Sequence, residues 1–161
     1  ELVSSVLMMT KNIDKKESFE IIENVIQSGK AIEKFSKMIH ALGGNIDFVE
    51  NYKKYLPKSS YVGEIKSNVK GSIQYIETRK LGLLLIELGG GRKQIEDKID
   101  YSVGYENIIS VGDKVESSSV LLKVHSSSKS EFEKLKNEIR DCFLINDKEQ
   151  MSLNCVYEKI K

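Results

Sequence analysis

The sequence has little proline and cysteine and no tryptophan: its 161 residues include one proline and two cysteines. Cys142 and Cys155 form no Cys-x-x-Cys pair, which excludes the commonest redox and zinc-ribbon spacings, and we interpret both as reduced, structural thiols of a cytoplasmic protein. Long apolar runs are also missing. The most apolar segment, Leu81–Leu88, is far shorter than the roughly 20 residues of a membrane-spanning helix.

An excess of either charge is absent too, because 25 basic and 24 acidic residues leave a net charge of +1. Binding to nucleic acid or to a membrane surface usually requires a concentrated basic patch, so we predict neither partner. The length suits one ordinary domain, with or without a helical appendage. Because the chain starts at Glu1 with no initiator methionine, we expect a fragment of a longer protein.

Residues 1–44 are predicted to be helical. Apolar side chains recur at helical spacing in three segments: Leu2–Met9, Phe19–Ile26 and Ala31–Leu42. Asp14 and Glu17 have the spacing of a capping box, and Gly43 with Gly44 is expected to end the third helix. The polar and aromatic residues 45–57 are predicted to form a connector between domains.

Residues 58–161 show the short β-rich runs and intervening helices of an α+β domain. The predicted strands are Tyr61–Ser67, Ser72–Glu77, Tyr101–Tyr105, Asn107–Ile109, Lys114–Val115, Val120–His125 and Asn154–Ile160. A hairpin-like turn, Asn68–Gly71, separates the first two. Thr78–Leu88 fits either a helix ended by Gly89 or a buried strand. Ser130 and Glu133 predict a capped helix whose apolar face extends to Phe143.

Three consecutive glycines, Gly89, Gly90 and Gly91, precede Arg92. Such a run can hold an anion on backbone N–H groups, with arginine as a partner, or it can simply end one element and start the next. It is not a P-loop, because no lysine-serine or lysine-threonine pair follows at the required position.

The chain offers no set of residues for catalysis or for binding a metal. His40 is interpreted as structural and His125 as a surface or hinge residue, and no cysteine–histidine set has metal-ligand spacing. Ser110–His125, with its Gly-Asp-x-Val turn before an apolar strand, resembles half of a biotinyl/lipoyl-type barrel. A carrier of that type needs a lysine, usually between methionines, and no Met-Lys-Met occurs. We therefore expect a hammerhead or barrel-sandwich architecture without a cofactor.

Four segments, taken together and in order, resemble the C-terminal part of thymidine phosphorylases and pyrimidine-nucleoside phosphorylases: Ser28–Asn45, Asp47–Pro57, Leu81–Gly104 and Val111–His125. They contain a Gly-Lys-Ala-x-Glu-x-Phe helix with a glycine pair, a Leu-Pro, a glycine-rich loop with arginine, and Gly-Asp-x-Val. The segment Asp47–Pro57 most resembles the bacterial thymidine phosphorylases. The resemblance implies that residues 1–44 end the helical and central portion. It also implies that 45–57 connect them to an α/β-hammerhead (barrel-sandwich-like) domain, 58–161.

The resemblance implies a function as well. Such enzymes reversibly cleave thymidine or deoxyuridine with inorganic phosphate, giving the base and 2-deoxyribose 1-phosphate, as cytoplasmic homodimers. Their catalytic, phosphate-binding and pyrimidine-binding residues lie upstream of the matching segments, so we expect this chain to be inactive by itself. The glycine-rich loop faces the active-site cleft in relatives, which predicts that Gly89–Arg92 helps to close it, with Arg92 in an interdomain hydrogen bond. A stand-alone hammerhead binding module is the alternative.

Overall fold

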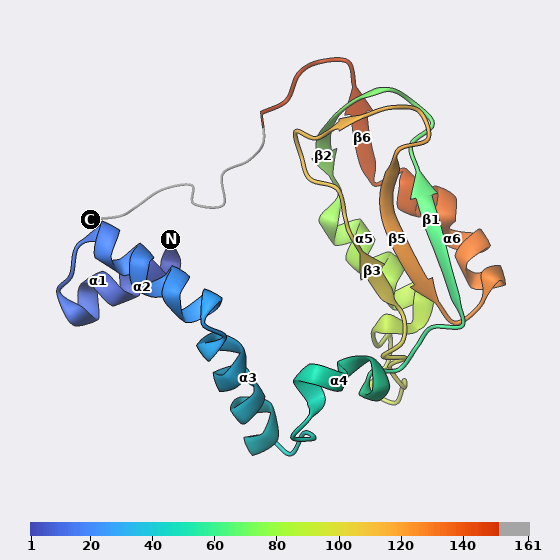
Figure 1. Ribbon diagram of the computed structural model, residues 1–161. Coiled ribbons are helices and arrows are strands. Elements are labelled where there is room, and N and C mark those ends of the chain that lie inside the picture. The colour runs from blue at the N-terminus through green and yellow to red at the C-terminus, as the bar shows by residue number, and fades with distance from the viewer. Residues whose placement is uncertain (152–161) are drawn as a thin grey trace. The chain divides into compact units, whose positions relative to one another are not determined.

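The computed structural model describes residues 1–151 (Figure 1). The chain divides into two compact units, residues 1–56 and, within the described part, residues 57–151. The strand predicted at Asn154–Ile160 and Cys155 lie outside the described residues. Among the helices of the described part, none has the length and apolar character needed to cross a membrane.

The first unit consists of four helices: α1 Leu2–Lys11, α2 Lys15–Gln27, α3 Lys30–Ala41 and α4 Phe48–Tyr55. The predicted cap of the second helix is confirmed, because the Asp14 carboxylate accepts a hydrogen bond of 2.8 Å from the Glu17 amide. The predicted stop after the third helix is confirmed as well. Gly43 adopts a left-handed conformation, with φ 91°, and its amide donates to the His40 carbonyl.

The segment predicted as a connector contains α4. The hydroxyl of Tyr55 donates to the Asp47 carboxylate at 2.5 Å, and the rings of Phe48 and Tyr55 stack with centroids 6.1 Å apart. Chiefly because of the tyrosine hydrogen bond, the pKa of Asp47 lies below its usual range. These local contacts hold the two ends of a helix that is too short to be stable by propensity alone.

The second unit combines two three-stranded antiparallel sheets with two helices. Its elements are β1 Tyr61–Lys66, β2 Gly71–Ile76, α5 Thr78–Leu85, the π-helical turn Ile86–Gly90, β3 Gly104–Glu106, β4 Lys114–Val115, β5 Val120–Ser126, α6 Lys129–Arg140 and β6 Phe143–Asn146. One sheet has the order β1-β5-β3 and the other β4-β2-β6. The predicted α+β class is confirmed, and the ambiguous run at Thr78 is a helix.

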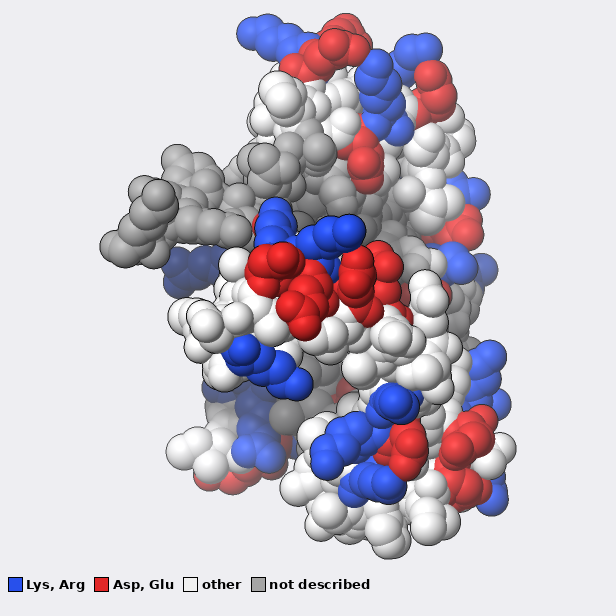
Figure 2. All heavy atoms as spheres, turned by 60° about the vertical axis from the view of Figure 1, so that its left-hand side comes forward, with Lys and Arg blue, Asp and Glu red and all other residues white. Residues whose placement is uncertain are grey.

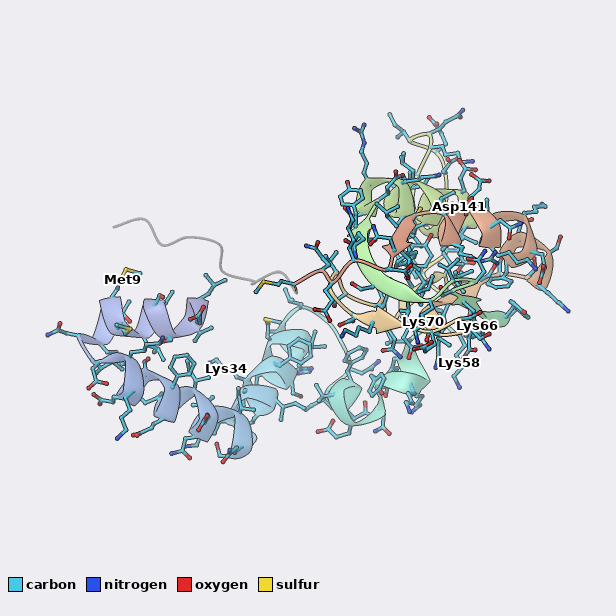
Figure 3. All side chains as sticks on the ribbon, turned by 90° about the horizontal axis from the view of Figure 1, so that it is seen from above. Met9, Lys34, Lys58, Lys66, Lys70 and Asp141 are labelled. Carbon is cyan, nitrogen blue, oxygen red and sulfur yellow. The ribbon has the colours of Figure 1, made fainter. Side chains whose placement is uncertain are left out.

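The hydrophobic core of the described chain lies entirely within this second unit. Its buried side chains are Ile65, Ile73, Leu81, Leu84, Leu88, Val115, Leu121, Leu122, Val124, Phe132, Ile139, Cys142 and Phe143. β5 is the central strand of its sheet, and both Leu121 and Leu122 are fully buried although successive side chains point to opposite faces. Side chains accordingly crowd the space between strands and helices in Figure 3.

The hairpin predicted at Asn68–Gly71 is wrong. β1 pairs with β5, whereas β2 pairs with β4 and β6, so the two strands belong to different sheets. The chain crosses between the sheets just after β1. At this point the Ser67 carbonyl accepts a backbone hydrogen bond of 2.8 Å from Ser118, and the Ser67 amide donates one of 2.9 Å to Ser119. Local turn residues marked the break in the chain correctly, but the partners of each strand are set by contacts distant in sequence.

Three further predictions require correction, two of them at the ends of α6. The helix is capped by Ser128, whose hydroxyl accepts from the Glu131 amide at 3.2 Å, and not by Ser130. The two serines have the same spacing to a glutamate, and Ser128 has the extended backbone that a cap needs. Phe143 belongs to β6 rather than to the helix, and Asn107–Ile109 forms no strand. Cys142 is buried and forms no disulfide, in agreement with its interpretation as a reduced, structural thiol.

Gly63 on β1 tests the packing of this core. A Cβ atom there would lie 2.5 Å from the ring of Phe132, a core residue. We expect Gly63→Ala to lower the free energy of unfolding by about 1–3 kcal/mol, because the ring has to move. Gly82→Ala is the control: it lies inside α5 with no atom within 4 Å, and should raise that free energy by up to about 1 kcal/mol. Urea unfolding followed by circular dichroism measures the free energy of unfolding of both variants. Equal changes in the two would contradict the close contact between Gly63 and Phe132.

Candidate functional site

The glycine run lies at the end of a helix whose other side is in the core. Leu81 and Leu84 of α5 and Leu88 of the π-helical turn are all buried, so one face is anchored along its length. The backbone leaves the helical conformation at Gly89, where φ is 99°. The carbonyl of Gly89 accepts a hydrogen bond of 2.9 Å from the Asp100 amide, which closes the loop between them. Turns of this kind, with a left-handed glycine, are common where a helix ends.

Each of the three glycines has a structural reason that requires no ligand. Gly89 has the left-handed conformation that side chains disfavour. A Cβ at Gly90 would lie 2.9 Å from the Leu85 side chain, and one at Gly91 would lie 2.7 Å from Ile86. The run therefore allows the chain to turn tightly against the helix that it has just left.

The loop that follows is held by its own carboxylates. Asp97 accepts hydrogen bonds from the amides of Lys93 and Gln94 at 2.9 and 3.0 Å, and Asp100 accepts from the amide and hydroxyl of Ser102. The backbone bonds from Gln94 and then Lys93 hold the pKa of Asp97 below its usual range. These bonds order the loop before anything binds to it.

Arg92 is exposed on this ordered loop. Within residues 1–151, its guanidinium forms no ion pair and no hydrogen bond, whereas the adjacent Lys93 pairs with Glu87 at 2.6 Å. Ile95 and Tyr101 are 87% and 78% exposed. Within residues 1–151 the loop thus presents two cations without an ion-pair partner, Arg92 and Lys98, and two apolar side chains to its surroundings.

A second feature, which the sequence did not reveal, joins three segments through His125. Its Nδ1 lies 3.2 Å from the Ser59 hydroxyl and its Nε2 lies 2.9 Å from the Glu106 carboxylate. A neutral imidazole protonated on Nε2 donates to Glu106 and accepts from Ser59, so one tautomer serves both bonds. His125 links the segment before β1 to the strands β5 and β3. Ser59 precedes His125 by 66 positions and Glu106 precedes it by 19, so no short sequence pattern could have linked the three residues.

The described residues contain no group of three or more His, Cys, Asp or Glu placed to hold a metal ion. Basic and acidic side chains lie next to one another over the face shown in Figure 2. Burial raises the pKa of the Tyr105 phenol, which stays protonated and donates to the Leu81 carbonyl at 3.2 Å.

Residues 72–146 match the family described as pyrimidine nucleoside phosphorylase C-terminal domain. The match begins within β2 and ends with β6, so it covers the anchored helix, the glycine run, Arg92 and His125. It confirms the resemblance to the pyrimidine nucleoside phosphorylases over the two segments that lie within it, Leu81–Gly104 and Val111–His125.

The hydrogen bond between His125 and Glu106 predicts a pH dependence. This bond, the largest influence, lowers the pKa of Glu106. A carboxyl whose pKa is lower in the folded state stabilises the fold above its unfolded pKa, and this contribution is lost as the pH falls through the folded pKa. We expect Tm to fall between about pH 5 and pH 3, and to fall less in Glu106→Gln. The exposed Glu96→Gln is the control and should behave as wild type; an identical profile for Glu106→Gln would contradict the assignment.

Proposed function

Because residues 72–146 carry the C-terminal domain of a pyrimidine nucleoside phosphorylase, we propose that the chain is the C-terminal part of an enzyme that acts on thymidine. The reaction is reversible cleavage with inorganic phosphate to thymine and 2-deoxyribose 1-phosphate. The family match supports the reaction class, and the resemblance of Asp47–Pro57 to the bacterial thymidine phosphorylases supports the substrate. Phosphate is the second substrate, and no cofactor is required.

The chemistry of this reaction defines what the C-terminal domain contributes. A phosphate oxygen attacks the anomeric carbon while the pyrimidine leaves as an anion, so positioned donors and a site free of water accelerate the step. The groups that bind phosphate and base belong to the remainder of the enzyme, and the chain by itself is inactive. Its role is to close the site, and the complete protein is a cytoplasmic homodimer.

The loop Gly89–Asp100 is the part of the chain suited to that closure. Its ends are fixed by the helix and by the bond from Asp100 to Gly89, so little ordering entropy remains to be lost when it docks. The Arg92 guanidinium offers five N–H donors and has no partner among the described residues. Arg92 donates a hydrogen bond across the closed cleft, with Gly89, Gly90 and Gly91 setting the direction in which the loop leaves the helix.

The alternative is a stand-alone hammerhead module that binds a partner without catalysis. It is favoured by one observation, the complete hydrophobic core of residues 57–151. The reading frame that contains this chain distinguishes the two. The protein it encodes should release thymine from thymidine only when phosphate is present, measured by the change in ultraviolet absorbance. If no thymine is released in the presence of phosphate, the proposed enzymatic function is contradicted and the binding module is favoured.

Arg92→Ala in the complete enzyme tests the closure. Loss of a hydrogen bond to a charged group, about 1.5 kcal/mol, should lower kcat roughly tenfold and leave the free energy of unfolding unchanged. Lys98→Ala, an exposed cation on the same loop, is the control and should stay within about twofold of wild type. Complete loss of turnover in Arg92→Ala would show that the residue acts in the chemical step instead. An unchanged kcat would show that Arg92 takes no part in closure.

A further inference from the structure

The chain passes from the first unit to the second through residues 57–60, the inter-unit segment, which belong to no helix or strand (Figure 1). α4 ends at Tyr55, and the pairing of β1 with β5 begins at Tyr61. Within residues 1–151, no backbone–backbone hydrogen bond joins the inter-unit segment to another described residue. The position of this segment on the second unit therefore depends on its side chains.

One side chain of the inter-unit segment is held. The Ser59 hydroxyl lies 3.2 Å from Nδ1 of His125, and this is the only side-chain hydrogen bond between the segment and the rest of the described chain. Ser60 is exposed and forms no such bond within residues 1–151. Two adjacent serines thus differ in one respect, the contact with His125.

His125 offers Ser59 a rigid partner. Its backbone lies on β5, the central strand, where it is opposite Val62 of β1 and Gly104 of β3. Its Nε2 donates to the Glu106 carboxylate at 2.9 Å, which fixes the rotation of the ring and leaves Nδ1 as the acceptor for the serine hydroxyl. Because the ring is already held, little of its freedom remains to be lost when the serine binds.

We propose that His125 fastens the inter-unit segment to β5 and so limits the joint between the two units to Pro57 and Lys58. At about 3.5 Å per residue, two residues span at most about 7 Å, whereas release of Ser59 lengthens the joint to four residues and about 14 Å. Proline fixes its own φ and keeps the preceding residue extended, as Leu56 is with ψ 135°, so the short joint has few free rotations. Hinges between domains consist of a few such residues. The inference does not depend on the thymidine reaction.

Trypsin provides the probe, because it cleaves after Lys58, directly before Ser59. When release and return of a segment are fast, its rate of cleavage follows the population of the released state. Loss of one hydrogen bond changes that population about fivefold. We expect His125→Ala to raise the rate of cleavage after Lys58 in the full chain by about this factor, measured by mass spectrometry of the fragments. Cleavage after Lys54, within α4, is the internal control and should stay within about twofold of wild type.

Substitutions of the two serines test the assignment. Ser59→Ala should raise the rate as much as His125→Ala, and Ser59→Thr, which keeps a hydroxyl, should stay near wild type. Ser60→Ala makes the same change one position further along and should have no effect. Each rate is divided by that of a synthetic peptide with the same sequence around Lys58, which removes effects on recognition by trypsin. Ser59→Ala with His125→Ala should be cleaved no faster than either single variant, since both remove one interaction.

Relaxation of the backbone ¹⁵N nuclei tests the proposal without a protease. The order parameters of Ser59 and Ser60 should be near 0.85 in the wild type and below about 0.6 in Ser59→Ala, whereas that of Tyr105 in β3 should stay unchanged.

Three results would overturn the proposal. Unchanged cleavage and unchanged order parameters in Ser59→Ala would show that the pairing of β1 alone holds the segment. Additive effects of the substitutions at Ser59 and His125 would show that the two residues act separately. An equal rise in cleavage in Ser60→Ala would show that the contact with His125 is not what holds the segment.

Discussion

Burial of a single apolar cluster between two small sheets and two helices is the interaction on which the structure of residues 57–151 depends. Each large aliphatic side chain that becomes fully buried contributes about 1.5–3 kcal/mol, and this cluster holds Ile65, Ile73, Leu121, Leu122 and their neighbours. Residues 1–56 have no such cluster, and their two buried side chains are serines whose hydroxyls lie 2.6 Å apart. The two units therefore differ in what stabilises them, although both have well-formed helices.

The same cluster positions the candidate site. Leu81, Leu84 and Leu88 anchor the helix, and its register determines where Gly89 ends it and where the loop begins. The hydrogen bond from Asp100 then returns the chain to the helix end. Arg92 consequently reaches solvent from a loop with two fixed ends. An arginine on a mobile loop could also make the proposed hydrogen bond across the cleft, but only with a larger loss of conformational entropy.

Sequence alone predicted the features that are local. The helices of residues 1–44, the cap at Asp14 and the stop at Gly43 follow from spacing and from glycine, and each is confirmed. Non-local features were missed: the exchange of strands between sheets at Ser67, and the contacts of His125 with Ser59 and Glu106. Such pairs depend on register across the sheet, which a pattern of period two leaves open. α3 shows the converse. The periodicity of its apolar side chains predicted a helix correctly, but it could not reveal that Phe35 and Met38 on its apolar face are exposed.

Hydrogen exchange of the intact chain, followed by mass spectrometry, tests most directly the claim that the core of residues 57–151 carries the stability. Amides of β1, β5 and α5 should exchange slowest, with a free energy of opening close to that of global unfolding. Amides of α1, α2 and α3 should exchange at least about a hundredfold faster, since little apolar surface is buried around them. Equal protection of α3 and β5 in the chain by itself would contradict the account.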